Sequence, residues 1–308
     1  MFLIKQPPLF RIRVLTALII GATCFVFYFQ RAAIVIAVVS YWRVPDETAS
    51  SFFIPKKIWY KLGPKGISPE IWNWTDSCVS RNPTFTREFL TDTSADEPYL
   101  SLPVPILKTD LLRYLLLLVE GGIWSDVDVS CEDTSIYEWI PEQFKQDAKL
   151  VVGLEFDVGW DSDFPRQFAS WTVLARPGSR HLRVVVDAIL NEIRATKEKY
   201  NLTNISELTL GMVGDVVDYT GPRRLTVGAL KSLSEQLGEM VDNRNVSRLL
   251  SPKLIEDGLI LPGYALALSA NNYDGVTWQN GTDFVPGPPL VTHHYAGSWK
   301  NSYGGEVV

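Results

Sequence analysis

The chain has 308 residues, of which 46% are hydrophobic and 12% aromatic, so it can bury a sizeable core and is not a disordered protein. Its formal net charge is −6, and its lysines and arginines are spread along the sequence rather than grouped. This balance argues against a nucleic-acid-binding protein, which usually carries a basic surface.

The N-terminal segment predicts a membrane anchor. Residues 12–29 are almost wholly apolar and just reach the ~20 residues that a spanning helix needs. Lys5, Arg11 and Arg13 precede this run, while Asp46 follows the apolar segment. Because positive charge tends to stay cytoplasmic, the body of the protein should lie in the lumen. The alternative is a cleaved signal peptide.

We therefore predict three parts: a cytoplasmic tail and signal-anchor segment at 1–43, a short stem at 44–53, and a lumenal domain at 54–308. Five Asn-x-Ser/Thr sequons agree with lumenal exposure of that domain. They are Asn73, Asn201, Asn204, Asn245 and Asn280.

The chain has three cysteines, and Cys24 lies in the apolar run. No Cys/His spacing typical of a zinc site occurs. In an oxidising lumen Cys78 and Cys131 can form a disulfide. The alternative is two buried free thiols.

Predicted strands and helices alternate along the lumenal part. Strands are expected at 55–60, 85–90, 123–129, 150–156, 171–175 and 259–268, the last broken by Pro262-Gly263. Helices are expected from Pro69, capped by Ser68, and over 106–120, 181–200 and 222–237. This alternation predicts an α/β domain with a mostly parallel central sheet.

The predicted helix 106–120 is apolar on all sides but carries two charges. Asp110 and Arg113 are three residues apart and share one face. Charges in a buried helix are costly unless they are paired or used. The two side chains therefore pair with each other or with a ligand.

Gly121-Gly122 ends this helix, and Asp126 and Asp128 follow on a predicted strand. Residues two apart on a strand point to the same side, so the carboxylates should repel each other. A hard divalent cation relieves that repulsion, and both Mg²⁺ and Mn²⁺ prefer such oxygen ligands. Ligands of α/β proteins bind beyond the strand ends, where this pair is expected.

The run 106–129 resembles the signature of glycosyltransferase family 32, the fungal initiation-specific α-1,6-mannosyltransferases and their relatives. The resemblance extends over roughly 54–300. It includes Pro55-Lys-Lys-Ile-Trp59, the region from Asn82 to Asp92, Thr220-Gly-Pro222 and the block from Val291 to Lys300.

The resemblance implies a GT-A-type nucleotide-sugar-binding domain and gives roles to the acidic residues. Asp128 would bind the metal directly, and Asp126 would contact the metal or the donor ribose. Asp110 and Arg113 would hold the sugar hydroxyls or the phosphate. Asp92 would line the nucleotide pocket.

The C-terminal block would supply further contacts. Either His293 or His294 would complete the metal shell. Ser298 and Trp299 would close over the diphosphate, and Lys300 would add electrostatic stabilisation.

Residues after two predicted strands are further candidates. Glu155 and Asp157 are candidate nucleophiles, although ordinary surface acids fit the pattern as well. Gln167 and Trp171 are candidates to face the acceptor, with a core position as the alternative for Trp171.

The function implied by the resemblance is metal-dependent, configuration-retaining transfer of mannose from GDP-mannose to glycoprotein glycans in the Golgi membrane, with Mn²⁺ or Mg²⁺ as cofactor. The expected protein is single-pass and type II, with other Golgi glycosyltransferases as possible partners and no nucleic-acid partner. Alternatives are a UDP-sugar donor, a glycolipid acceptor, or a non-catalytic sugar-binding scaffold subunit.

Overall fold

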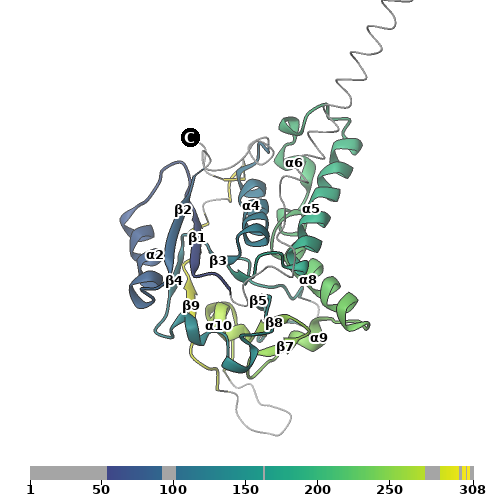
Figure 1. Ribbon diagram of the computed structural model, residues 1–308. Helices are drawn as coiled ribbons and strands as arrows, with labels where there is room; N and C mark the ends of the chain where they lie inside the picture. The colour runs from purple at the N-terminus through teal and green to yellow at the C-terminus, as the bar shows by residue number, and fades with distance from the viewer. Residues whose placement is uncertain are drawn as a thin grey trace, which may run out of the picture. The chain divides into compact units, whose positions relative to one another are not determined.

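The computed structural model describes residues 54–91, 102–161, 164–274, 285–297, 300–302 and 304–305 (Figure 1). The predicted anchor and stem lie outside the described residues. So do Asp92, Asn280, Ser298 and Trp299. Among the helices within these ranges, none combines the length and apolarity needed to cross a membrane.

A seven-stranded sheet forms the centre of the domain, in the order β2-β1-β3-β6-β5-β8-β7. Its strands are β1 Lys57–Lys61, β2 Thr86–Leu90, β3 Gly122–Ser125, β5 Leu150–Gly153, β6 Thr172–Ala175, β7 Lys253–Ile255 and β8 Gly258–Leu261. The α/β class is confirmed, and six of the strands begin within two residues of the predicted starts, whereas β7 was not predicted.

The sheet is mixed, but five of its seven strands (β2, β1, β3, β5 and β8) run in the same direction and only β6 and β7 are reversed, so the prediction of a mostly parallel sheet is confirmed. The pairs β1–β2, β1–β3 and β5–β8 are parallel, whereas β3–β6, β5–β6 and β7–β8 are antiparallel. A parallel neighbour needs a crossover connection, but the loop from β5 returns at the same edge of the sheet. Strand β6 therefore runs opposite to β3 and β5, which lie on either side of it.

Both faces of the sheet are covered, which explains why β3, β5, β6 and β8 are buried along their whole length. Alternate side chains enter two separate cores: Trp59 and Trp124 face one, while Ile58 and Ile123 face the other. A strand buried on both faces reads as a continuous apolar run in the sequence.

Long helices supply the first of these cores: α4 Pro105–Val119, α5 Arg180–Lys199 and α8 Pro222–Leu237. Figure 1 places them on one side of the sheet and α2, Pro69–Arg81, on the other. Ser68 caps α2 as predicted, since its Oγ accepts a hydrogen bond from the Ile71 amide at 3.2 Å. Four short helices complete the fold within the described ranges: α6 Leu210–Val213, α7 Val216–Tyr219, α9 Asn243–Val246 and α10 Gly263–Ala267.

A second, two-stranded sheet pairs β4, Val129–Cys131, with β9, Val291–His293, in antiparallel register. The disulfide between Cys78 and Cys131 links α2 to β4. One of the two alternatives for these cysteines is therefore confirmed. A cross-link that spans 53 residues stabilises the fold by about 4 kcal/mol in the chain-entropy account.

Three predicted strands are shorter than expected. The strand predicted over 123–129 ends at Ser125, and the one predicted over 150–156 ends at Gly153. The strand predicted over 259–268 ends at Leu261 and gives way to α10. Pro262 is the N-cap of α10, so the Pro-Gly pair ends the strand and starts a helix.

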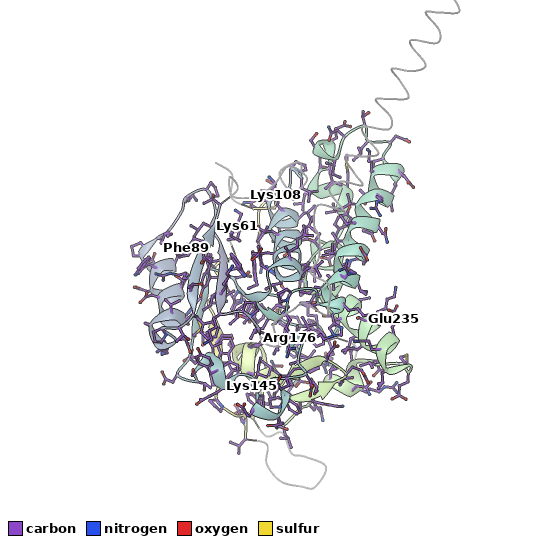
Figure 2. All side chains as sticks on the ribbon, viewed as in Figure 1. Lys61, Phe89, Lys108, Lys145, Arg176 and Glu235 are labelled. Carbon is purple, nitrogen blue, oxygen red and sulfur yellow. A yellow bond between two sulfur atoms is a disulfide. The ribbon has the colours of Figure 1, made fainter. Side chains whose placement is uncertain are left out.

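Charged groups lie at one edge of the sheet, where β5 and β8 begin and β6 ends. The Arg176 guanidinium donates to the carbonyls of Lys145 and Gln146 at 2.8 and 2.6 Å, and Figure 2 labels both Arg176 and Lys145. Nearby, His181 Nε2 lies 2.7 Å from Asp257 Oδ1, and the Lys149 ammonium lies 3.3 Å from the same carboxylate. This edge holds its charges in pairs.

Candidate metal centre

Two glycines allow the turn from α4 into β3, which places Asp126 and Asp128 at the edge of the sheet. Gly121 and Gly122 have φ of +66° and +100°. A Cβ on Gly121 would lie 2.5 Å from the Cδ of Pro177, and one on Gly122 would lie 2.7 Å from the Lys57 carbonyl oxygen. Only glycine combines this conformation with such close approach. As a result α4 passes directly into β3 beside β1.

Asp126 and Asp128 lie in a turn and not on a strand, so that detail of the prediction is wrong. The Asp126 amide donates to the Trp171 carbonyl at 2.8 Å, and the Val129 amide donates to the Asp126 carbonyl at 3.1 Å. The second bond closes a four-residue turn between β3 and β4. The turn still brings the two carboxylates close together, as the sequence predicted for residues on a strand.

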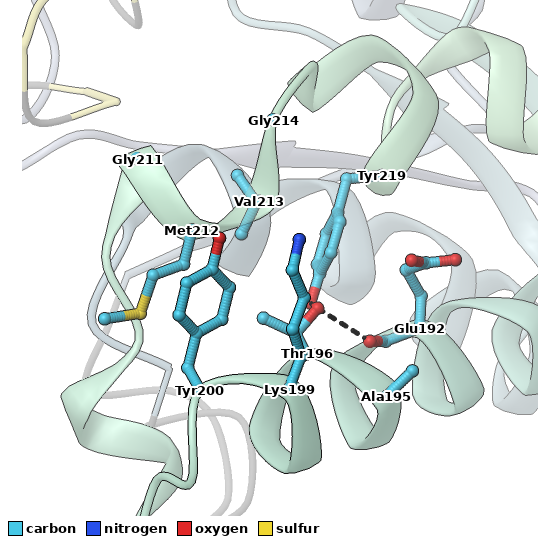
Figure 3. Close-up of a pocket in the computed structure, with 10 residues that line it drawn as sticks. All are labelled: Glu192, Ala195, Thr196, Lys199, Tyr200, Gly211, Met212, Val213, Gly214 and Tyr219. Carbon is cyan, nitrogen blue, oxygen red and sulfur yellow. Dashed lines mark hydrogen bonds between the residues drawn. The ribbon is translucent and has the colours of Figure 1, made fainter.

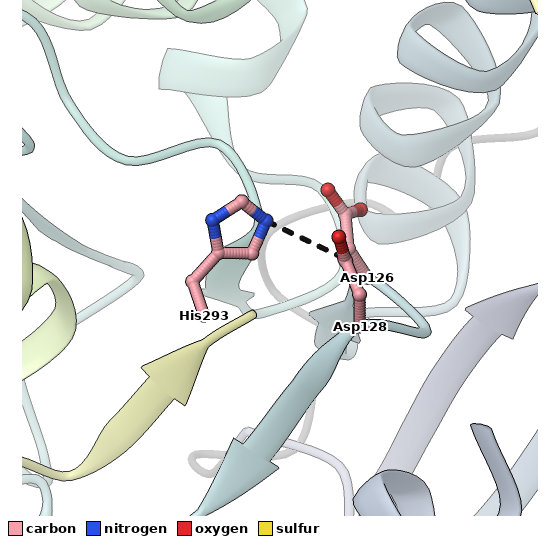
Figure 4. Close-up of side chains that lie close together, drawn as sticks. All are labelled: Asp126, Asp128 and His293. Atoms are coloured by element: carbon pink, nitrogen blue, oxygen red, sulfur yellow. Dashed lines mark ion pairs between the residues drawn. The ribbon is translucent and has the colours of Figure 1, made fainter. Parts of the chain in front are cut away.

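His293 joins the two acids to form a three-residue group, here called the acid–histidine cluster. One ligand atom from each of Asp126, Asp128 and His293 lies within 4.8 Å of the others. Figure 4 shows the imidazole, carried at the end of β9, facing the two carboxylates. Residues more than 160 positions apart in sequence therefore meet because β4 pairs with β9.

Asp126 is fixed from the helical side of the sheet. Arg113 Nη2 donates to its two carboxylate oxygens at 3.0 and 3.4 Å, and Trp124 Nε1 donates to Oδ1 at 2.7 Å. Arg113 Nη1 lies 3.3 Å from Asp110 Oδ1. The Asp–Arg pairing that the sequence left open is thus present, and it extends to the motif.

Asp110 and Arg113 are each 3% exposed, so they act from beneath the surface of the site. Thr220 Oγ1 donates to Asp110 Oδ2 at 2.9 Å. This threonine belongs to the Thr-Gly-Pro turn of the sequence resemblance, although its role as a partner of Asp110 was not predicted. Burial raises the pKa of Asp110 to about 6, against the opposing effects of Arg113 and Thr220.

Asp128 is fixed from the C-terminal side. Its Oδ2 accepts from the Ala296 amide at 2.9 Å, and its Oδ1 lies 3.4 Å from His293 Nε2. Burial opposes ionisation, but His293 and the backbone donors outweigh it and lower the pKa of Asp128. The carboxylate is therefore held in its charged form, the form that binds a cation.

The two adjacent histidines point to opposite sides, as successive residues at the end of a strand should. The His293 ring stacks on Trp171, with 4.4 Å between ring centroids and 3° between planes. The His294 ring instead stacks on Trp74 at 4.6 Å, and its Nε2 lies 2.9 Å from Ser130 Oγ. The geometry thus places His293, and not His294, in the cluster.

The donor set fits a divalent cation. Two carboxylates and one imidazole suit Mn²⁺ or Mg²⁺, and the three side chains reach a common point from different elements. His293 Nδ1 is buried without a hydrogen-bond partner among the described residues.

Glu155 and Asp157 follow β5 in different environments. Gln167 Nε2 donates to Glu155 Oε2 at 2.7 Å, and burial raises the pKa of Glu155, which the charges of His293 and Lys300 oppose. Asp157 accepts from the Arg248 amide at 2.8 Å, so it ties two loops together.

Trp171 has the core position that was its alternative. It is 5% exposed, and its Nε1 donates to the Leu266 carbonyl at 3.0 Å. Tyr295 was not predicted. Its ring meets the edge of His293 at 4.1 Å, and its φ of +51° is the structural sign that this segment is held in an unusual conformation.

A separate cavity of about 260 Å³ lies between the C-terminal half of α5 and helix α6 (Figure 3). Glu192, Lys199, Tyr200, Met212 and Tyr219 are among its lining residues. No residue of the acid–histidine cluster lines it, and neither does any predicted site residue.

Sequence comparisons agree with the site. Residues 59–145 match the family described as glycosyltransferase sugar-binding region containing DXD motif. The chain is 29% identical over 272 residues to the initiation-specific alpha-1,6-mannosyltransferase of Schizosaccharomyces pombe, a match that covers 80% of this chain and 64% of that protein. It is 24% identical over 300 residues to the enzyme of the same name from Candida albicans, covering 84% of this chain and 75% of that one.

Likeness to solved structures is more distant. PaToxG glycosyltransferase is 14% identical and aligns with a TM-score of 0.37, covering 69% of this chain and 80% of that one. The sequence matches and the motif carry the assignment instead. They show that this chain is similar to glycosyltransferases that contain a DXD motif.

Proposed function

We propose that the chain is a metal-dependent, configuration-retaining mannosyltransferase of GT-A type that transfers mannose from GDP-mannose to glycoprotein glycans. The observation that carries the proposal is the acid–histidine cluster, in which Asp126, Asp128 and His293 converge within 4.8 Å. The two relatives are α-1,6-mannosyltransferases, which supports mannose as the transferred sugar.

The residues around the cluster have distinct tasks in this proposal. Transfer releases a nucleoside diphosphate, on which negative charge grows, and a bound divalent cation supplies Lewis-acid stabilisation there. Arg113 and Trp124 keep Asp126 in one orientation, and Ala296 does the same for Asp128. Such preorganisation avoids reorganising the site as charge develops.

Nucleoside diphosphate release by the full-length chain in detergent tests the proposal. The assay uses Mn²⁺, an oligomannose glycan, and GDP-mannose beside a set of UDP-sugars. We expect release from GDP-mannose that EDTA abolishes. Release from a UDP-sugar but not from GDP-mannose would show that the donor is a UDP-sugar. Release only when a glycolipid is present would show that the acceptor is a glycolipid.

A matched pair of variants connects turnover to the cluster. Asp128→Asn should lower turnover by at least about 100-fold, because it removes a charged ligand and even the loss of a group that only supports a ligand costs about 10–100-fold. Asp133→Asn removes an acid whose side chain is 98% exposed near the end of β4, and it should leave turnover unchanged. Mn²⁺ binding that survives in Asp128→Asn would contradict the cluster as the metal site. Mn²⁺ and donor binding without any release would favour a non-catalytic scaffold subunit.

We also propose a single-pass type II arrangement in the Golgi membrane with the domain in the lumen. The disulfide supports an oxidising compartment, and the sequon residues Asn73, Asn201 and Asn204 are exposed. Glycosidase treatment of the protein from cells should increase its mobility on a gel. A protein that carries no N-glycan and two free thiols would contradict the lumenal location.

A further inference from the structure

Three aromatic rings cluster on the described part of the loop that joins β5 to β6. Phe156, Trp160 and Phe164 lie with ring centroids 4.3–4.9 Å apart. Trp160 and Phe164 are each 36% exposed. Burying aromatic surface is favourable, so two large rings kept together at the surface are available to pack against a ligand.

This loop belongs to the edge of the sheet that carries the acid–histidine cluster. It begins with Glu155, two residues after the end of β5, and it ends at Trp171, on which the His293 ring stacks. The aromatic rings therefore lie on the segment that flanks the candidate metal centre.

One short element fixes both the loop and the C-terminal segment. This is the 3₁₀ turn η6, Leu268–Ala270. Trp160 Nε1 donates to the Ala270 carbonyl at 2.7 Å, and Tyr295 is hydrogen-bonded to the side chain of the neighbouring Ser269. Trp160 and Tyr295 are thus anchored at adjacent residues, and the Tyr295 ring in turn contacts the His293 ring of the cluster at 4.1 Å.

Asn271 stiffens the base of the loop. Its Oδ1 accepts from the amides of Asp157 and Val158 at 2.6 and 2.8 Å, and its Nδ2 donates to the Glu155 carbonyl at 3.0 Å. A surface whose rings are held before a ligand arrives loses less conformational entropy on binding.

The chemistry of this surface fits a sugar ring. The axial C–H groups of a hexose form an apolar face that packs on an aromatic ring, while its hydroxyls need hydrogen-bonding partners. The loop that carries the rings also carries Glu155 and Gln167, which are bonded to each other at 2.7 Å. A carboxylate accepts more than one hydrogen bond, so Glu155 can still accept one from a sugar hydroxyl.

We propose that Trp160, Phe164 and Tyr295 form the acceptor surface, on which a hexose ring of the glycan stacks while its reacting hydroxyl is directed toward the acid–histidine cluster. The inference rests on the proposed function, since it names where the acceptor of that reaction binds. It assigns no role to the donor.

Steady-state kinetics with an oligomannose glycan test this surface. Trp160→Ala should raise the KM for the glycan by about ten-fold, since an aromatic contact of this kind contributes on that scale. The KM for GDP-mannose and the slow hydrolysis of GDP-mannose without acceptor should stay unchanged. Trp160→Phe, which keeps a ring, should recover most of the acceptor affinity.

Trp72→Ala is the matched control, because Trp72 is 46% exposed on α2 and packs under Arg87 at 4.1 Å. It should leave the KM for the glycan unchanged. An unchanged glycan KM in Trp160→Ala would overturn the proposal. A parallel loss of donor hydrolysis in that variant would also overturn it, because the indole would then support the fold and not the acceptor.

Ligand-observed NMR separates this inference from the proposed function. Saturation transfer to the oligomannose glycan should be strong with the parent chain and lost with Trp160→Ala, whether or not turnover occurs. Binding without release from any donor would contradict the proposed function and support the surface. Turnover together with equal glycan binding in the parent chain and in Trp160→Ala would support the proposed function and contradict the acceptor surface.

Discussion

Opposite edges of the seven-stranded sheet carry buried charges in different ways. At the amino ends of β5 and β8, the carboxylate of Asp257 meets both His181 and Lys149. At the carboxyl ends, Asp110, Asp126 and Asp128 converge on a single buried guanidinium, that of Arg113, and on the imidazole of His293. The first edge balances its charges with its own side chains, whereas the second keeps an excess of negative charge for a cation.

The largest effect should come from removing the guanidinium at the site edge. Arg113→Met leaves the buried Asp110 without its ion pair, and we expect a loss of about 3–5 kcal/mol in the free energy of unfolding. Urea denaturation measures it. Arg194→Met, at an exposed position of α5, is the control and should change stability by less than about 0.5 kcal/mol. A small loss in Arg113→Met would mean that the acids of this edge are already neutralised in another way.

The second-largest effect should be the stabilisation of the folded protein by Mn²⁺, which depends on only one of the two edges. Mn²⁺ at about 100 times its dissociation constant should stabilise the protein by about 2.7 kcal/mol, since it binds the folded state. We expect the shift in thermal midpoint to vanish with EDTA and in Asp128→Asn, and to persist in Asp257→Asn. The same shift in both variants would place the cation outside the acid–histidine cluster.

Lowering the pH should reduce the stability that Asp257 contributes at the amino ends of β5 and β8. Burial opposes ionisation of Asp257, but the bond and charge of His181 and the Lys149 ammonium lower its pKa from 3.8 to about 2. Because the folded-state pKa is depressed, the stabilisation is complete above about pH 4 and is lost as the pH falls toward 2. It amounts to about 2 kcal/mol. Asp257→Asn should be less stable at neutral pH, and the difference from the parent should shrink over that range.

The smallest effect concerns the second histidine. His294→Ala removes a stack on Trp74 and should cost about 1 kcal/mol of stability while Mn²⁺ affinity stays the same. His293→Ala should weaken Mn²⁺ binding, as followed by isothermal calorimetry. Weaker Mn²⁺ binding in His294→Ala but not in His293→Ala would show that the metal binds at His294, on the other face of β9.

The segment around Asp110 and Asp126 was predictable because its signals are local. A buried apolar helix, a glycine pair and two acids stand within about twenty residues, and the spacing of Asp110 and Arg113 made their pairing one of two predicted alternatives. The turn that carries Asp128 was not predictable, because the bond from the Asp126 amide to Trp171 depends on the placement of β6.

The choice between the two histidines also depended on distant partners. Adjacent residues of one strand carry the same sequence signal, and only the register of β9 against β4 decides which ring faces the acids. Likewise, nothing in the sequence near Trp160 and Tyr295 indicates that both are anchored to η6.

The pairing of β4 with β9 has a consequence for how the protein is made. The ribosome reaches His293 roughly ten to thirty seconds after it has finished Cys131, at ordinary rates of synthesis. Until then Asp126 and Asp128 have no imidazole beside them, and the outer edge of β4 has no partner strand. A nascent chain that stalls in that interval can already hold its disulfide and much of its sheet, and yet lack the site. Completion of the last few strand residues is thus the step that assembles the acid–histidine cluster.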